Sequence, residues 1–140
     1  MPSPILEQRM HLLEHNREAV MVMLGKSVAS GLAVEDSVAV IADTRDSVGG
    51  ALARALAKKH PGLDTDTEAA RAQARSEIPT LVAIVTVKAA ADVFRIPNPG
   101  VSAGLRRPIR PGHVRVVVVG AGGSTLLGVP VEMVRGGGSA

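Results

Sequence analysis

Basic residues gather between positions 95 and 115, where their types suit anion binding. The stretch holds five arginines and no lysine, and a guanidinium group binds carboxylate or phosphate through two parallel hydrogen bonds. Pro108 and Pro111 stiffen it, so its charges lose less entropy on binding. The sequence predicts an anion-binding loop, with a solvated basic loop or a subunit contact as the alternative. The candidate ligands are Arg95, Arg106, Arg107, Arg110, His113 and Arg115.

The charge distribution agrees with a localised basic region. Residues 93–140 carry six arginines and one acidic residue, Glu132, whereas residues 1–92 carry ten basic and twelve acidic residues. Such a region raises the local concentration of anions, including phosphates and the nucleic-acid backbone. The sequence has one Phe, Phe94, and no Trp or Tyr, so a nucleic acid would be bound through its backbone rather than by base stacking. Both a small anionic ligand and a nucleic acid are therefore hypotheses for the partner.

Two carboxylates, Asp43 and Asp46, follow an apolar run and precede a helical pattern. Open sheets place ligands at such strand-to-helix junctions. Carboxylates three residues apart suit Mg²⁺ binding or acid–base catalysis. Alternatively, Asp46 caps the helix and Asp43 pairs with Arg45 or with water. An enzyme acting on a small carboxylate or phosphate compound is thus a further hypothesis, with Asp43 and Asp46 as candidate catalytic residues.

His11 and His15 are four residues apart on a predicted helix and therefore share one face. Zinc would need a third ligand, for which Glu7, Glu14 and Glu18 are the local candidates. These residues also form the polar side of an amphipathic helix, and a solvated face is the simpler interpretation. The chain contains no cysteine, which excludes thiolate metal sites. We predict neither a metal site nor a cofactor.

A glycine-rich turn at residues 120–125 allows two interpretations. Backbone N–H groups of such a turn can cradle a phosphate, but the lysine of a P-loop and the helix that should follow are missing. The two flanking runs are rich in β-branched residues and Gly122-Gly123 sits between them, which favours a hairpin.

The elements that would position these residues follow from hydrophobic periodicity. A helical pattern spans residues 3–30, with Gly31 suited to end it. An apolar, β-branched run at 37–42 predicts a buried strand, and the run at 80–88 predicts a central one. The remaining expected elements are helices near 46–60 and 65–77, a helical turn at 89–93, a structureless loop at 95–112, and hairpin strands at 114–119 and 125–134, with Pro130 at an edge.

Together these elements predict an α+β fold with a mixed sheet of about four strands that ends in a C-terminal β-hairpin, and with helices packed on one face. We expect a single domain over residues 1–135 and a flexible Gly/Ser tail at 136–140. No apolar run is long enough to span a bilayer and no signal peptide is evident, which predicts a cytoplasmic protein without a membrane partner. Exposed strand edges predict a homo-oligomer.

Residues 17–59 resemble the helix–strand–helix unit of the small trimeric chorismate mutases, over less than a third of the chain. The resemblance rests on a helix, on the run at 34–41, and on Thr44-Arg45-Asp46 followed by an alanine-rich helix. In that family, arginines at subunit interfaces hold a dicarboxylate substrate. The resemblance therefore implies a trimeric arrangement with a substrate-holding role for Arg106, Arg107, Arg110 or Arg115.

Overall fold

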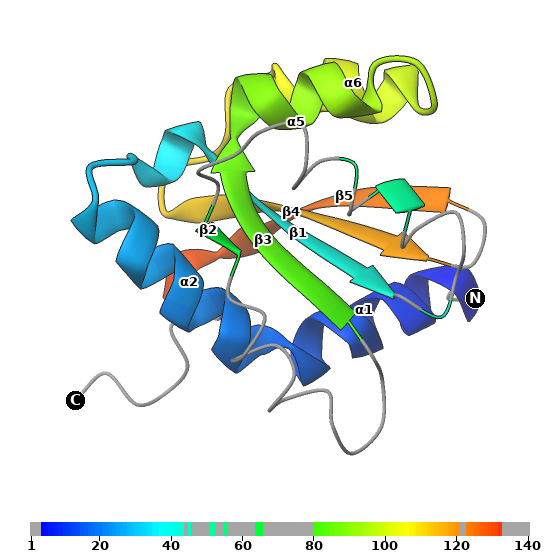
Figure 1. The fold of residues 1–140 in the computed structure, drawn as a ribbon, viewed down its shortest axis with the longest axis horizontal. Coiled ribbons are helices and arrows are strands. Elements are labelled where there is room, and N and C mark those ends of the chain that lie inside the picture. Colours follow the sequence, from blue (N-terminus) through cyan, green and yellow to red (C-terminus); the bar gives the residue numbers. More distant parts are fainter. Residues whose placement is uncertain are drawn as a thin grey trace.

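A mixed β-sheet forms the centre of the molecule in the computed structural model, with strand order β2-β3-β1-β4-β5 (Figure 1). The structure describes residues 4–43, 45, 51–52, 55, 64–65, 80–120 and 123–132. The strands are β1 (Ser37–Asp43), β2 (Asp64–Thr65), β3 (Thr80–Thr86), β4 (His113–Gly120) and β5 (Gly123–Pro130). β1 is parallel to β4, and the other neighbours pair antiparallel. The predicted α+β fold with a mixed sheet and a C-terminal hairpin is confirmed.

The three inner strands form where the sequence is almost continuously apolar. β1 is buried from Ser37 to Ala42, and Val38 and Ile41 are fully inaccessible although they lie on opposite faces. Runs of β-branched residues favour such strands because their side chains pack well on a pleated surface. β3 ends at Thr86, two residues before the predicted end, because the Thr86 hydroxyl accepts a hydrogen bond from Ala89 N (3.1 Å) and thereby caps the next helix.

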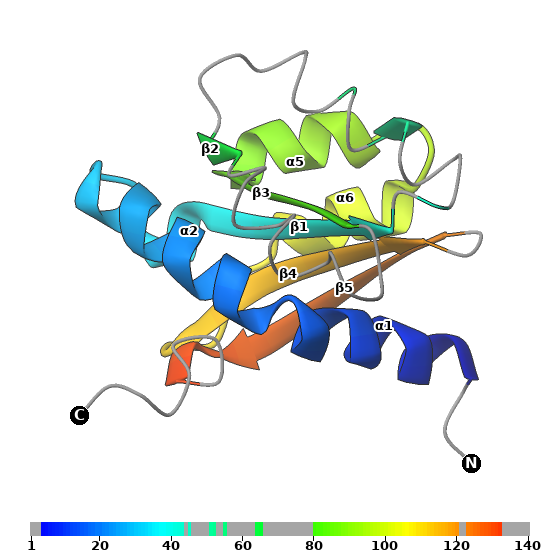
Figure 2. The ribbon, with the colours of Figure 1, turned by 60° about the horizontal axis from the view of Figure 1, so that its bottom comes forward.

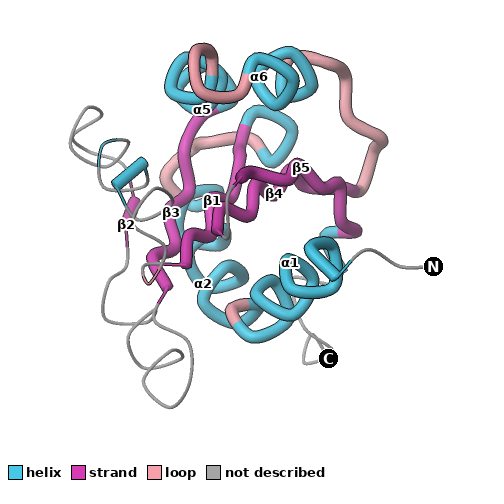
Figure 3. The backbone as a smooth tube through the Cα atoms, turned by 90° about the vertical axis from the view of Figure 1, so that its right-hand side faces the viewer, coloured by secondary structure: helices cyan, strands magenta, loops and turns pink. Residues whose placement is uncertain are grey.

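Helices cover both faces of the sheet, so the expected packing on one face alone is wrong (Figures 2 and 3). α1 (Pro4–His15) and α2 (Arg17–Ala29) pack on one face, against a core that includes Ile41 and Val116. α5 (Val87–Phe94) and α6 (Pro99–Leu105) pack on the other, around Val40 and Val117. The physical reason is that β1 and β4 are apolar on both faces, and each face must be shielded from water. In the described part of the chain, no helix is long and apolar enough to cross a membrane.

The predicted N-terminal helix over residues 3–30 is two helices, divided at Asn16. The Asn16 side chain is fully buried and its Nδ2 donates to the Leu12 carbonyl (2.8 Å). Asparagine competes with the backbone for such hydrogen bonds, which favours a change of helix direction. The second helix ends as predicted, with Gly31 in the left-handed region (φ 105°).

A short helix, α6, occupies the middle of the segment 95–112 that the sequence predicts to be structureless. The Asn98 Oδ1 accepts a hydrogen bond from Val101 N (3.1 Å), and Pro99 is the first helical residue. Both features are favourable at a helix start. The absence of hydrophobic periodicity concealed this helix, whereas the Asn-Pro pair marked its beginning. The helical turn predicted at 89–93 is confirmed as part of α5.

The C-terminal hairpin pairs Gly120 with Gly123 and leaves β5, the strand with Pro130, at the edge of the sheet, as predicted. β5 ends at Pro130, four residues before the predicted end at 134. A strand directly follows the glycine-rich turn, which supports the hairpin over the phosphate cradle. The helices expected near 46–60 and 65–77 lie largely outside the described residues, and Thr65 belongs to β2. The predicted tail at 136–140 also lies outside them.

Candidate functional site: two regions at opposite ends of β4

The predicted site residues separate into two regions, one at each end of β4. Arg115 and His113 lie at the beginning of the strand, while Gly120 lies at its end, beside Asp43. At about 3.3 Å per residue, Arg115 and Gly120 are about 16 Å apart along the strand. The structure therefore does not bring the arginine-rich segment together with Asp43. Asp46 lies outside the described residues.

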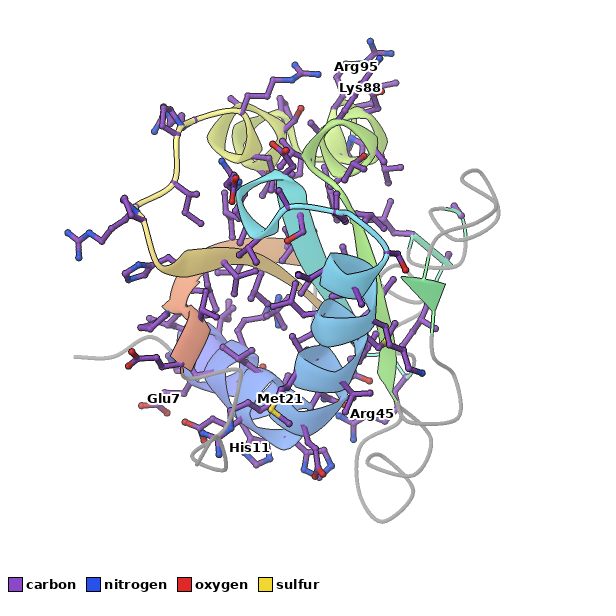
Figure 4. The ribbon with its side chains drawn as sticks, turned by 90° about the vertical axis from the view of Figure 1, so that its left-hand side faces the viewer. Glu7, His11, Met21, Arg45, Lys88 and Arg95 are labelled. Atoms are coloured by element: carbon purple, nitrogen blue, oxygen red, sulfur yellow. The ribbon has the colours of Figure 1, made fainter. Side chains whose placement is uncertain are left out.

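Two of the exposed cations lie on the outer side of α5. Lys88, Asp92 and Arg95 follow one another at spacings of four and three residues, which places them on one helix face. Lys88 and Arg95 are exposed and point away from the sheet (Figure 4). The opposite side of α5, including Ala90 and Phe94, is buried in the core. The apolar side of α5 thus fixes which way its cations point.

The end of α6 adds arginines to the same layer. Arg106 Nη2 lies 3.5 Å from Asp92 Oδ1, which joins the end of α6 to the outer side of α5. Both side chains are about half exposed (56% and 41%), and an exposed pair at this distance is weak. Arg107 and Arg110 are exposed, and within the described residues neither forms an ion pair. We call Lys88, Arg95, Arg106, Arg107 and Arg110 the α5–α6 basic surface.

Arg115, in contrast, is buried and holds backbone in place. Its side chain donates one hydrogen bond to the Glu35 carbonyl, in the 3-10 helix η1 (Val34–Asp36), and another to the Arg107 carbonyl (2.7 Å). Only 8% of the residue is exposed. Arg115 therefore positions the segment that carries Arg107, while its own charge faces the interior.

Arg110 and His113 line a groove of about 580 Å³, beside the residues that follow β5. Val34, Ile109 and Val131 supply apolar wall, and Glu35 and Glu132 also line the groove. His113 Nδ1 lies 3.1 Å from the Pro111 carbonyl, a contact that fixes the ring if Nδ1 carries the proton. The two glutamates make this groove mixed in charge, and Arg110 stands at the border between it and the α5–α6 basic surface.

A second hollow, of about 500 Å³, opens at the carboxyl ends of β1 and β4. Its lining includes Glu7, His11, Asp43 and Arg45, of which Glu7, His11 and Arg45 are labelled in Figure 4. Arg45 donates two hydrogen bonds to the Asp43 carboxylate, from Nε to Oδ1 (3.0 Å) and from Nη2 to Oδ2 (2.8 Å). These hydrogen bonds hold the pKa of the Asp43 carboxyl below its ordinary value of 3.8. A carboxylate held in this way is a weak base at neutral pH.

The Asp43–Arg45 pair should make stability depend on pH in the acid range. Because its pKa is lowered in the folded state, Asp43 contributes stability that is present above about pH 4 and lost as the pH falls through the folded value. We expect the free energy of unfolding of Asp43→Asn to fall less steeply than that of the wild type as the pH drops below about 4, as measured by urea unfolding followed by circular dichroism at several pH values. Arg45→Ala should show the same weaker dependence on pH. If both variants lost stability in acid as steeply as the wild type, this assignment would be contradicted.

Arg9 is a residue of this region that sequence reasoning missed. It lies on the sheet-facing side of α1, only 2% exposed, and donates to the Gly120 carbonyl and to the Gly123 carbonyl (3.1 Å). It therefore clamps the base of the hairpin turn. The signal was available, because position 9 is three residues after Leu6 and four before Leu13, on the apolar face of the predicted helix.

The histidines of α1 do not form a metal centre with the described residues. The His11 and His15 rings are 6.1 Å apart between centroids. No group of three or more His, Asp or Glu side chains suited to a metal ion occurs in the part of the chain that the structure describes. His11 lies instead at the hollow beside Asp43.

The geometry separates an exposed basic surface from a hollow whose carboxylate is already held by arginine. No family model matches this sequence, and neither a curated protein nor a solved structure is detectably similar to the chain.

Proposed function

We propose that this protein binds an anionic partner through the α5–α6 basic surface. The observation that carries the proposal is the arrangement of five exposed cations on adjoining elements, where Asp92 is the one described ion-pair partner, at 3.5 Å from Arg106. Exposed cations that lack close partners attract anions and exchange their counterions for them. Four of the five are arginines, whose planar groups match carboxylate and phosphate.

The shape of the surface favours an extended partner over a small one. Lys88 and Arg95 are separated by about 10 Å along α5 at 1.5 Å per residue, and Arg106 reaches the same layer from α6. Arg110 lines the groove of about 580 Å³ beside the residues that follow β5, whereas Arg95, Arg106 and Arg107 do not line it. Small ligands are normally enclosed by concave sites. A chain of separated negative charges, such as a nucleic-acid backbone or an acidic polypeptide, fits spaced cations better.

Removal of two arginines should weaken this binding without affecting the fold. We expect Arg106→Ala combined with Arg107→Ala to lower the affinity for an oligonucleotide about tenfold at low salt, because two phosphate contacts are lost. The measurement is fluorescence anisotropy with a labelled single-stranded oligonucleotide across a salt series. The slope of log K against log salt should fall in magnitude by about 1.4, at about 0.7 per contact for a single strand.

A matched control separates this site from general charge. Arg17→Ala removes an exposed arginine on α2, on the opposite layer of the molecule, and should leave the affinity nearly unchanged. If the control and the double variant lost the same affinity for the oligonucleotide, the loss would be caused by net charge and not by this surface. Wild-type affinity in the double variant, with its circular dichroism spectrum intact, would remove the α5–α6 basic surface from the proposal. Binding of acidic polypeptide but not of the oligonucleotide would assign the partner to protein.

A further inference from the structure

The outer edge of β5 carries backbone hydrogen-bonding groups directed away from the sheet. Val131 N donates to the Gly112 carbonyl (2.8 Å), and hydrogen-bonded pairs alternate along an antiparallel ladder. With the observed register, the odd-numbered residues of β5 therefore bond to β4. The even-numbered residues Ser124, Leu126 and Gly128 direct their N–H and C=O groups outward, and Pro130 has no N–H to offer. Among the described strands, none pairs with this edge (Figure 3).

This edge lacks the usual protection of natural edge strands. β5 is eight residues long and contains no charged residue, and its one proline, Pro130, is the last residue of the strand. Exposed edges are normally blunted by lysine, by proline inside the strand, or by shortness. Its Leu126 and Leu127 are only partly buried, although each packs against a core cluster on its own face of the sheet. Two identical neutral edges meet without charge repulsion. Additional apolar surface becomes covered when they do.

From this edge we infer that two copies of the chain pair through β5, antiparallel and about a two-fold axis at Leu126. In this register all three outward-facing residues form hydrogen-bonded pairs: Leu126 with Leu126 of the second copy, and Ser124 with its Gly128 in both directions. A register shifted by two residues one way sets Ser124 opposite Pro130, which has no N–H to return the hydrogen bond, and a shift the other way leaves Gly128 without a partner among the described residues. The small residues Ser124 and Gly128 face each other, which avoids crowding on either side of the leucines. The two five-stranded sheets become one continuous sheet.

Position 128 provides the first test, because a substitution there changes the edge and little else. A Cβ on Gly128 would meet nothing within 4 Å. Gly128→Pro removes an outward N–H that the β4–β5 ladder does not use, and Gly128→Ala retains it as the matched control. In light scattering across a concentration series, we expect dimers for the wild type and for Gly128→Ala. We expect monomers for Gly128→Pro, with its circular dichroism spectrum unchanged.

Cysteine cross-linking tests the register in a chain that has no cysteine of its own. Leu126→Cys would place two thiols opposite each other with Cα atoms about 5.5 Å apart, which a disulfide can span. Ser124→Cys would separate the thiols by about four residues, about 13 Å, which is too far. We expect rapid oxidation to a covalent dimer only for Leu126→Cys, even if Gly128→Pro fails to fold. A monomeric wild type, a dimeric Gly128→Pro, or equal cross-linking at both positions would overturn the inference.

Discussion

Arg9→Ala is expected to lower the free energy of unfolding by about 3 kcal/mol, because it removes the charged donor from one buried and one partly buried carbonyl. The Gly120 and Gly123 carbonyls accept hydrogen bonds from Arg9 across the base of the hairpin turn. Without the guanidinium, the buried Gly120 carbonyl would lose its charged donor. Gly120 is already crowded, since a Cβ there would lie 3.2 Å from Asp43 Cβ. Urea unfolding followed by circular dichroism is suitable because the chain has no Trp or Tyr.

Arg9→Met separates the hydrogen bonds from the packing, because methionine retains much of the aliphatic volume. We expect it to be destabilised nearly as much as Arg9→Ala, since the carbonyls still lose their donors. Arg17→Ala, at an exposed position of α2, should change the free energy of unfolding by about 0.5 kcal/mol or less. If Arg9→Met were as stable as the wild type, the stability contributed by this side chain would come from packing rather than from its hydrogen bonds to the turn.

Arg115→Ala is expected to cost about 2 to 3 kcal/mol of stability and also to weaken anion binding. The buried side chain joins β4 to the Glu35 carbonyl and to the Arg107 carbonyl. Its loss leaves both carbonyls without a charged donor. The segment with Arg107 and Arg110 then lacks its anchor to the sheet, so the affinity for the oligonucleotide should fall although Arg115 itself is not exposed.

Two readouts distinguish this positioning role from direct contact with the ligand. Arg107→Ala should weaken binding but leave the urea midpoint unchanged, because the Arg107 side chain is exposed and the bond to Arg115 uses its backbone carbonyl. Arg115→Ala should change both quantities. If Arg115→Ala weakened binding with an unchanged urea midpoint, Arg115 would be a direct ligand, and the positioning role would be wrong.

The inner strands β1, β3 and β4 could be predicted from the sequence because their composition determines their state almost independently of context, whereas β2 was not predicted. The runs at 37–42, 80–86 and 114–119 are dense in valine and isoleucine, and such runs are stable only where both faces are covered. The same two-sided apolar character implies cover on both faces, so the prediction of helices on one face alone did not follow from these runs. The α6 helix was missed because Gly100 and Gly104 lower its intrinsic propensity. Tertiary packing stabilises α6 despite this low propensity, since Gly104 lies close against Leu126.

The candidate ligands could be predicted as a group but not sorted by role. Arginine content identified residues 95–115, yet composition does not tell an exposed guanidinium from one that holds backbone carbonyls. Arg115 stands between Val114 and Val116 in a predicted strand, and this position indicates a side chain directed at a packed layer. Contacts between residues distant in sequence, such as Arg9 with Gly120, required the fold itself.

The parallel pairing of β1 with β4 determines what a partly synthesised chain exposes. β1 can join β3 early, but its other edge waits for residues that come 77 positions later in the chain, since Val38 pairs with Arg115 and Ala42 with Val119. Until then, a strand edge that is apolar from Val38 to Ala42 stays open to solvent or to a neighbouring nascent chain. The β4–β5 hairpin thus covers this edge, and the time for which the edge stays open is set by how quickly synthesis and folding reach residue 120.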